Sequence, residues 1–273
     1  MSEADAIARS AERGPATLTT LTSDLRSLGV VEGQTLIVHT ALSRLGWVAG
    51  GPITLIHALR KAIGSSGTLV MPTHSAGLSD PATWQNPPVP EAWWQQVREE
   101  LPAFDPCETP TREMGVVAEA FRSLPGALRS NHPIGSFAAQ GPNASVFTAE
   151  HPREDIFGDG SPLGRLYDLD ASLLLLGVGH ANNTSLHLAE CRVGTEWREQ
   201  GSPVLRGGQR RWVTYRERRH DSDDFTPIGE AYAAGGGTVR TGRVGSGDGL
   251  LAPVREMVDF AVAWMVDRRG ATV

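Results

Sequence analysis

The alternation of apolar and polar positions along the chain predicts helices and strands that follow one another. In residues 18–28, apolar residues recur every three or four positions, which is typical of one helix face. The run of leucines at 173–176 has the length of a strand that is buried on both faces. The same reasoning predicts helices at 53–63, 116–124, 144–148 and 253–266, and strands at 35–38, 68–71 and 211–215. Such alternation indicates a layered α/β sheet.

Two stretches lack this periodicity. Residues 74–113 are rich in proline, tryptophan and acidic residues, and so long an irregular stretch is usually either functional or poorly ordered. The glycine-rich residues 233–249 are predicted to form a loop, and their pattern is not that of a P-loop. We expect the whole chain, 1–273, to form a single domain, with residues 1–16 as a loosely ordered extension.

One segment combines a strand with candidate chemistry. The leucines at 173–176 are followed by a glycine-rich turn and by good N-cap residues at 182–185, so His187 falls in the first turn or so of a helix. His187 and Glu190 are three residues apart and share one helix face. The helix dipole disfavours the imidazolium and the carboxylate favours it, which could leave a neutral, oriented base near pH 7. The alternative from spacing alone is an ordinary surface pair.

The residues from Leu173 to Glu190 resemble the signature of the aminoglycoside 3-N-acetyltransferase family. Further blocks match this family in the same order, and together the resemblance covers roughly residues 17–267. These blocks lie at 38–46, 67–73, 104–115, 129–139, 161–163 and 242–245. The resemblance implies a three-layer α/β/α fold with a central mixed sheet, distinct from the common GNAT acetyltransferase fold.

The resemblance also implies a reaction. Family members transfer an acetyl group from acetyl-coenzyme A to the 3-amino group of a 2-deoxystreptamine aminoglycoside, which confers antibiotic resistance. We expect direct attack by the amine in a ternary complex, with His187 as general base and Glu190 orienting it. Asp221 aligns with an acidic position of the family and is a candidate for a catalytic or a substrate-binding role. Its alternative is a solvated loop carboxylate.

Two further groups of residues are candidates for binding. The cofactor candidates are His39, Thr40, Ala41, Leu42, Ser43, Thr73, Arg129, Ser130 and His132. A packing or capping role is an equally good interpretation of His132. Acids of the segment 80–113 and of the loop near 221 are expected to bind the ammonium groups of the acceptor. The acids chosen as candidates are Asp80, Asp105, Glu108, Asp221 and Asp223.

The composition of the chain argues against several classes of protein function. The net charge of −6 argues against a nucleic-acid partner and is compatible with a polycationic ligand. No apolar run approaches the length of a membrane span, and Cys107 and Cys191 are too few for a disulfide framework, so we expect a cytoplasmic protein. The histidines show no HExxH pattern, and no metal is expected. The oligomeric state is left open.

Three other functions compete with this interpretation. A hydrolase that uses serine, histidine and aspartate is disfavoured because no G-x-S-x-G motif is present. A relative that acetylates a different amine stays open. A non-catalytic ligand-binding protein of the same fold is disfavoured because both His187 and Glu190 are present.

Overall fold

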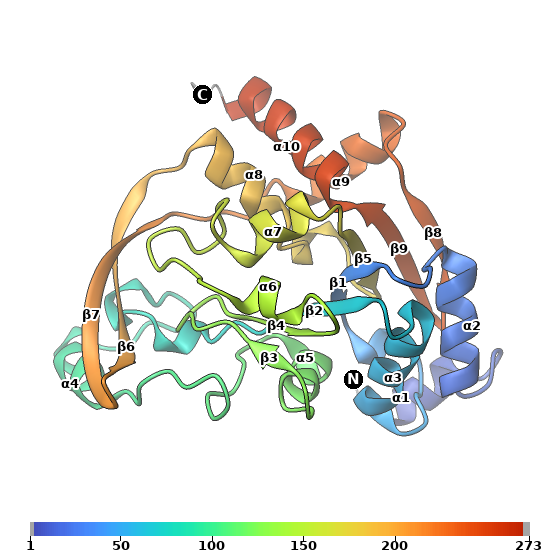
Figure 1. Cartoon of the computed structure of the whole chain (residues 1–273), viewed down its shortest axis with the longest axis horizontal. Coiled ribbons are helices and arrows are strands. Elements are labelled where there is room, and N and C mark those ends of the chain that lie inside the picture. Colours follow the sequence, from blue (N-terminus) through green and yellow to red (C-terminus); the bar gives the residue numbers. More distant parts are fainter. Residues whose placement is uncertain (1–2, 270–273) are drawn as a thin grey trace.

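The computed structural model describes residues 3–269, and a mixed β-sheet lies at its centre (Figure 1). Within these residues the strand order is β3-β4-β2-β1-β5-β9-β8. β1 pairs in parallel with β2 and with β5, whereas the outer pairings are antiparallel. The strands are β1 (Thr35–Thr40), β2 (Thr68–Pro72), β3 (Leu128–Arg129), β4 (Phe137–Gln140), β5 (Ser172–Leu176), β8 (Arg240–Val244) and β9 (Gly247–Pro253).

The sheet is covered by helices on both faces, because its central strands carry apolar side chains on both sides. In β5, Leu173 and Leu175 pack in one hydrophobic cluster, and Leu174 and Leu176 pack in the other. The helices of one layer are α2 (Leu18–Leu28), α3 (Gly51–Ile63) and α5 (Gly115–Arg122). The opposite layer contains α6 (Ala144–Thr148), α7 (Pro162–Asp168), α8 (Leu186–Val193), α9 (Phe225–Ala234) and α10 (Val254–Arg269). The predicted three-layer α/β/α fold with a mixed sheet is confirmed.

The glycine-rich stretch 233–249 was predicted to be a loop, and this was wrong for its second half. It contains β8 and the start of β9, which form a hairpin at the sheet edge. A Cβ atom at Gly247 would come within 2.7 Å of the carbonyl oxygen of Arg44, and one at Gly249 within 2.9 Å of Leu28. These glycines therefore allow close packing of a strand, and the sequence pattern did not distinguish that role from a loop.

The irregular segment 74–113 packs against a separate two-stranded hairpin. This hairpin consists of β6 (Trp197–Arg206) and β7 (Gln209–Arg218), which includes the predicted strand 211–215. The amide of Phe104 donates to the carbonyl of Pro203 at 3.0 Å, and the segment contains the helix α4 (Trp94–Glu100) and several 3₁₀ turns. The segment is thus held by backbone and side-chain contacts with the hairpin.

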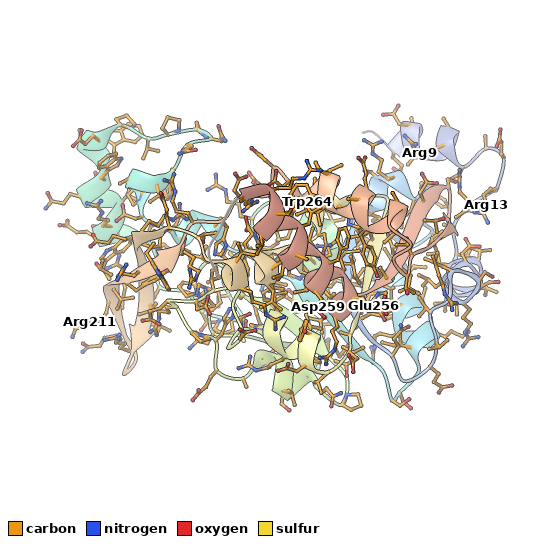
Figure 2. The ribbon with its side chains drawn as sticks, turned by 90° about the horizontal axis from the view of Figure 1, so that it is seen from above. Arg9, Arg13, Arg211, Glu256, Asp259 and Trp264 are labelled. Carbon is orange, nitrogen blue, oxygen red and sulfur yellow. The ribbon has the colours of Figure 1, made fainter. Side chains whose placement is uncertain are left out.

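The N-terminal residues 3–16, predicted to be a loosely ordered extension, contain the helix α1 (Glu3–Arg9). The amide of Trp47 donates to the Ser10 hydroxyl at 2.7 Å, and its indole donates to Glu3 at 2.9 Å. These contacts attach the N-terminal residues to the loop after β1. Figure 2 shows Arg9 of α1 and Arg211 of the hairpin at opposite ends of the molecule.

None of the helices in residues 3–269 combines the length and the hydropathy that a membrane span requires.

Candidate active site

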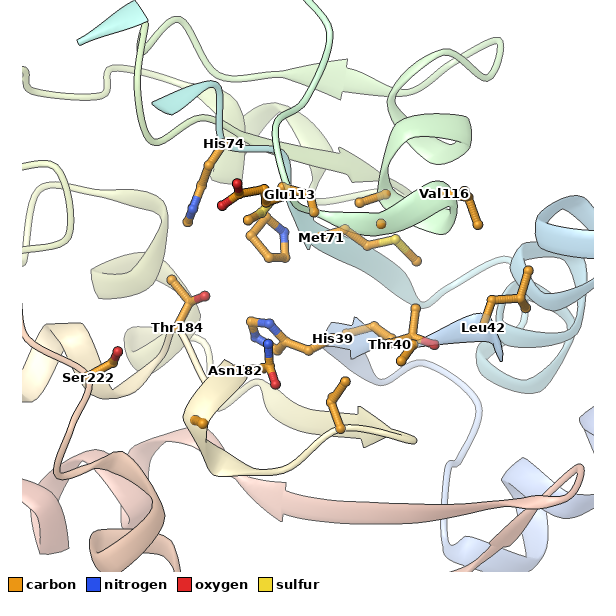
Figure 3. Close-up of a pocket in the computed structure, with 18 of the residues that line it drawn as sticks. His39, Thr40, Leu42, Met71, His74, Glu113, Val116, Asn182, Thr184 and Ser222 are labelled. Carbon is orange, nitrogen blue, oxygen red and sulfur yellow. The ribbon is translucent and has the colours of Figure 1, made fainter. Parts of the chain in front are cut away.

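A cavity of about 660 Å³ lies at the carboxyl ends of β1, β2 and β5 (Figure 3). In a sheet of this kind, the loops that follow parallel strands meet at the same edge, where ligands usually bind. One wall comes from β1, from the turn after β5 and from α8, and includes His39, Thr184 and His187. The opposite wall comes from the end of β2 and from the residues just before α5, and includes His74 and Glu113.

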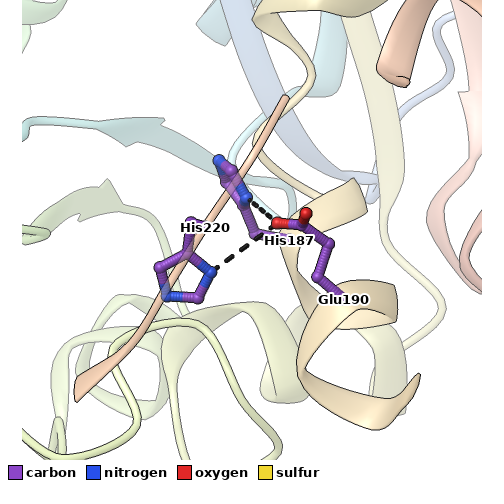
Figure 4. Close-up of side chains that lie close together, drawn as sticks. All are labelled: His187, Glu190 and His220. Atoms are coloured by element: carbon purple, nitrogen blue, oxygen red, sulfur yellow. Dashed lines mark hydrogen bonds and ion pairs between the residues drawn. The ribbon is translucent and has the colours of Figure 1, made fainter. Parts of the chain in front are cut away.

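His187 and Glu190 form a close pair on α8, as the helical spacing predicted. The Nδ1 atom of His187 lies 2.6 Å from Oε2 of Glu190, and Figure 4 shows the contact. Phe157 stacks on the imidazole at 4.8 Å with an angle of 9° between the rings, and Phe225 meets it edge-on. Because His187 lines the cavity and its Nδ1 is held by the carboxylate, its Nε2 is the nitrogen left for a ligand.

Glu190 is completely buried and is surrounded by positive and polar groups. Arg269 Nη1 lies 3.2 Å from its Oε1, the amide of Asp221 donates to the same oxygen, and His220 Nδ1 lies 3.7 Å from Oε2. Burial alone would raise the pKa of Glu190, but its interactions with His187 and His220 outweigh burial and lower the pKa to about 2. The carboxylate is therefore charged at neutral pH and can stabilise an imidazolium.

The pKa of His187 is lowered from its ordinary value of 6.5, mainly because the ring is buried, while the hydrogen bond from Nδ1 to Glu190 acts in the opposite direction. The imidazole is therefore predominantly neutral at pH 7. In the tautomer whose Nδ1–H donates a hydrogen bond to Glu190, Nε2 carries a lone pair. This is the protonation state that a general base requires.

Two more imidazoles line the cavity, and both are kept neutral. Burial lowers the pKa of His39 and that of His74 to about 3, and the charge of His187 adds to the effect. The Nε2 atoms of both rings are buried and have no hydrogen-bond partner. The sequence prediction included His39 but missed His74, although its position just after the predicted strand 68–71 placed it at a site-forming strand end.

The predicted cofactor-binding residues fall into two groups. His39, Thr40, Ala41, Leu42 and Ser43 line the cavity. The other four, Thr73, Arg129, Ser130 and His132, do not line it.

The residues of the second group form hydrogen bonds inside the protein, which differs from the binding role expected from the sequence. Arg129 donates to the carbonyl of Thr73 at 2.6 Å and to Ser136 at 2.9 Å, so its guanidinium organises neighbouring loops and is not free for a phosphate. Ser130 is fully buried and hydrogen-bonded to His151. Nδ1 of His132 accepts hydrogen bonds from backbone amides, which matches the packing role considered as its alternative.

None of the five predicted acceptor-binding acids lines the cavity, and three of them lie in the segment 74–113. Asp80 forms an ion pair with Arg98 at 2.8 Å, and Asp105 accepts hydrogen bonds from the amides of Cys107 and Glu108. Glu108 itself is exposed. These carboxylates have local structural roles or face solvent, which the clustering of acids in the sequence did not reveal.

Asp221 and Asp223 are exposed residues on either side of Ser222, which lines the cavity. The carboxylate of Asp221 accepts a hydrogen bond from the amide of Asp223 at 2.9 Å. The negative charge of Asp221 also raises the pKa of His187, although less than Glu190 does. Asp221 is thus close enough to influence the base, but its carboxylate is not bonded to the imidazole.

His220 and Arg269 contact Glu190, and sequence reasoning missed both. Arg269 lies near the C-terminal end of α10, and its pairing with Glu190 spans 79 positions, so no local pattern reveals it. His220 directly precedes the predicted Asp221, but one isolated histidine in a loop carries no spacing signal.

The ligand atoms of His187, Glu190 and His220 lie within 4.8 Å of one another, which raises the question of a metal. The 2.6 Å separation of His187 Nδ1 and Glu190 Oε2 is that of a strong hydrogen bond. A zinc ion would need about 2.0–2.2 Å to each ligand atom and would face the positive charge of Arg269. The arrangement therefore favours an oriented imidazole over a metal centre.

The chain is similar to known proteins of one family, both in sequence and in fold. The family model described as aminoglycoside 3-N-acetyltransferase matches residues 37–266. Aminoglycoside N(3)-acetyltransferase VII of Streptomyces paromomycinus is 38% identical, with 94% of each chain covered. The crystal structure of the YokD protein from Bacillus subtilis superimposes with a TM-score of 0.92, at 40% identity over 95% of this chain and 96% of that one. A structure of AAC-IIIb in a binary complex with CoASH superimposes with a TM-score of 0.84, at 32% identity over 93% and 98%.

Proposed function

Because this chain belongs to the aminoglycoside 3-N-acetyltransferase family, we propose that it transfers the acetyl group of acetyl-CoA to the 3-amino group of a 2-deoxystreptamine aminoglycoside. The observation that carries the proposal is the neutral, oriented His187 at the wall of the cavity, bonded to the buried Glu190. Acetylation removes a positive charge from the antibiotic, and the expected consequence for the cell is resistance.

The proposed role of His187 is to remove a proton. An ammonium group has no lone pair, so the amine must lose a proton to attack the thioester carbonyl carbon, where a C–N bond forms and the C–S bond breaks. Nε2 of His187 accepts this proton in a ternary complex, and no covalent enzyme intermediate is needed. The nitrogen loses a second proton as the amide forms, and this proton neutralises the departing thiolate, so that CoA leaves as the free thiol. Glu190 stabilises the imidazolium that results, because its carboxylate stays charged and bonded to Nδ1.

The last residues of β1 suit the thioester arm of the cosubstrate. His39 Nε2 and Thr40 Oγ1 are buried polar atoms without a partner, and both residues line the cavity. Unpartnered polar atoms of this kind fit the amide groups of an extended pantetheine arm. Among the described residues that line the cavity there is no lysine or arginine, so the phosphates would lie outside it.

We assign Asp221 a role at the acceptor side of the base. Its position beside Ser222 puts a negative charge at the rim, and its amide is bonded to Glu190. An approaching ammonium group would be attracted there, and the same charge favours the protonated form of His187. The kinetics of Asp221→Asn distinguish the two possible roles. A higher acceptor KM would indicate binding, and a lower kcat at unchanged KM would indicate catalysis.

The test of the proposed function is release of free thiol from acetyl-CoA in the presence of a panel of aminoglycosides. We expect acceptor-dependent release, a product acetylated at the 3-amino group, and increased resistance in cells that express the protein. Thiol release that does not require an acceptor would indicate a thioesterase. Release that depends on other amines but not on any aminoglycoside would indicate a different N-acetyltransferase.

A further inference from the structure

The wall of the cavity opposite α8 carries a single formal charge. Among the described lining residues, Glu113 is the only carboxylate, and no lysine or arginine accompanies it. The imidazole of His74, on this wall, is neutral at pH 7 because burial lowers its pKa to about 3, and the same holds for His39 on the facing wall. A cation that enters the cavity therefore meets one negative group and no positive one on this wall.

The carboxylate of Glu113 forms few contacts that would stabilise the fold. Its side chain is 81% exposed, and its ion-pair contact with Arg112 is long, at 4.0 Å between Nε and Oε1. A surface pair with this geometry contributes little to stability. By contrast, the carboxylates of Asp80 and Asp105 are engaged in short contacts away from the cavity.

The backbone at Glu113 has an unfavourable conformation. Its φ is 62°, a left-handed value that costs an L-residue free energy and that glycine adopts freely. Asparagine or glycine would suit this position better if only the turn into α5 mattered. The backbone places the carboxylate at the cavity mouth, where the side chain projects beside His74 (Figure 3).

His74 adds a hydrogen-bonding group to the same wall. Its Nε2 is buried and has no partner, and its ring packs against Phe137 and Phe157 at centroid distances of 5.3 and 5.4 Å. The aromatic packing fixes the ring, so that a polar ligand group can meet it without reordering the side chain.

We propose that Glu113, with His74 beside it, forms a subsite for a second ammonium group of the acceptor, one that is not acetylated. The acceptor then spans the cavity, with its reactive amine at His187 and a second amine at Glu113. This inference rests on the proposed function, since it assigns a residue to the recognition of the same polyamine substrate. Glu113 acts in binding and specificity and takes no part in proton transfer.

The first experiment compares Glu113→Gln with Glu91→Gln, a change to an exposed acid of the same segment that lies outside the cavity lining. Glutamine keeps the shape and the backbone cost of Glu113 and removes the charge. We expect the acceptor KM to rise about three- to fivefold, the upper part of the range for a partly exposed ion pair. The kcat at saturating acceptor and the KM for acetyl-CoA should not change, and Glu91→Gln should resemble the parent protein.

A second experiment uses two aminoglycosides that differ only by an amino group replaced with a hydroxyl group away from the 3-position. The parent protein should prefer the acceptor with the additional amine, and Glu113→Gln should lose most of that preference for at least one such pair. Glu113→Gly, which removes both the charge and the backbone cost, should show the same kinetic loss with an unchanged or higher Tm.

Binding calorimetry with sisomicin separates failure of this inference from failure of the proposed function. If the parent protein binds sisomicin but acetylates neither it nor any other aminoglycoside of the panel, the proposed function fails, and weaker binding by Glu113→Gln still supports the subsite. An unchanged acceptor KM and unchanged sisomicin affinity in both Glu113 variants would overturn the inference. A loss of kcat at unchanged acceptor KM would also overturn it, because it would place Glu113 in the chemical step.

Discussion

The two walls of the cavity are built in different ways. On the α8 wall, His187 and Glu190 satisfy one another at 2.6 Å, and the carboxylate is further held by Arg269 and by the amide of Asp221. On the opposite wall, His74 has an unpartnered nitrogen and Glu113 is largely exposed. On the α8 wall the His187–Glu190 pair is thus bonded within the protein, whereas on the other wall His74 Nε2 has no partner and the Glu113 carboxylate has one long contact, with Arg112.

This difference corresponds to two kinds of task. A base must hold one tautomer and one orientation throughout the reaction, so its partners belong to the protein and rest on regular elements. A recognition surface needs groups that find their partners in the ligand, and unsatisfied polar atoms at a cavity are suited to that. The comparison therefore supports our proposals that proton transfer takes place at the α8 wall and that the other wall contributes to acceptor recognition.

The largest effect is expected on the α8 wall. His187→Ala should lower kcat about 10²–10⁴-fold, because the amine loses its proton acceptor, while binding of acetyl-CoA persists. In the parent enzyme, activity should fall at acidic pH, through a pKa below 6.5, and this limb should disappear in the variant. Steady-state kinetics from pH 5 to 8 test this, with His57→Ala on the exposed side of α3 as control. Activity of the variant within a few-fold of the parent would remove His187 from the role of base.

Glu190→Gln should have the next largest effect. A hydrogen bond to a charged group is worth about 1.5–3 kcal/mol, so we expect kcat to fall roughly ten- to a hundredfold. Glu190 raises the pKa of His187, so without its charge the acidic limb of the rate profile should move to lower pH. The measurement is the same pH profile. A limb that stays in place or moves upward would contradict the proposed coupling between the two residues.

The same contrast explains what the sequence could predict. The α8 wall follows from local patterns, since a leucine run, a glycine turn and a spacing of three residues place His187 and Glu190 on one face. The contacts of Arg129 could not be predicted in this way, because its partners, among them the carbonyl of Thr73 at 56 positions away, are set by tertiary structure. The importance of Glu113 depends on a backbone angle and on the path of an aperiodic segment, which residue patterns do not encode.

The next prediction concerns stability and the imidazoles outside the dyad. His39 and His74 have pKa values of about 3 in the folded protein against an ordinary 6.5, so below pH 6.5 the unfolded chain binds more protons. Stability should therefore fall as the pH decreases from 6.5 towards 3, by up to about 1.4 kcal/mol per pH unit for each histidine. Glu190, with its pKa of about 2, adds to the loss only below about pH 4.5.

Urea unfolding between pH 7 and 5 tests this, because that window lies above the range in which Glu190 contributes. His39→Asn should reduce the slope of unfolding free energy against pH, and His57→Asn, an exposed histidine of α3, should leave it unchanged. Equal slopes in the parent and in His39→Asn would show that His39 does not stay neutral in the folded protein.

The smallest effect is expected at Asp221. Its exposed carboxylate lies at the rim beside Ser222, and partly exposed ion pairs are worth about 0.2–1 kcal/mol. Asp221→Asn should therefore raise the acceptor KM by at most about fivefold. Added salt should weaken acceptor binding by the parent protein and should have less effect on the variant, since exposed charges are screened within about 8–10 Å. Acceptor KM at two salt concentrations gives both quantities, with Glu91→Gln as control.

A decrease in kcat at unchanged KM would instead place Asp221 with His187 and Glu190 in the chemical step. The α8 wall would then extend into the loop before α9, and acceptor recognition would rest more heavily on Glu113.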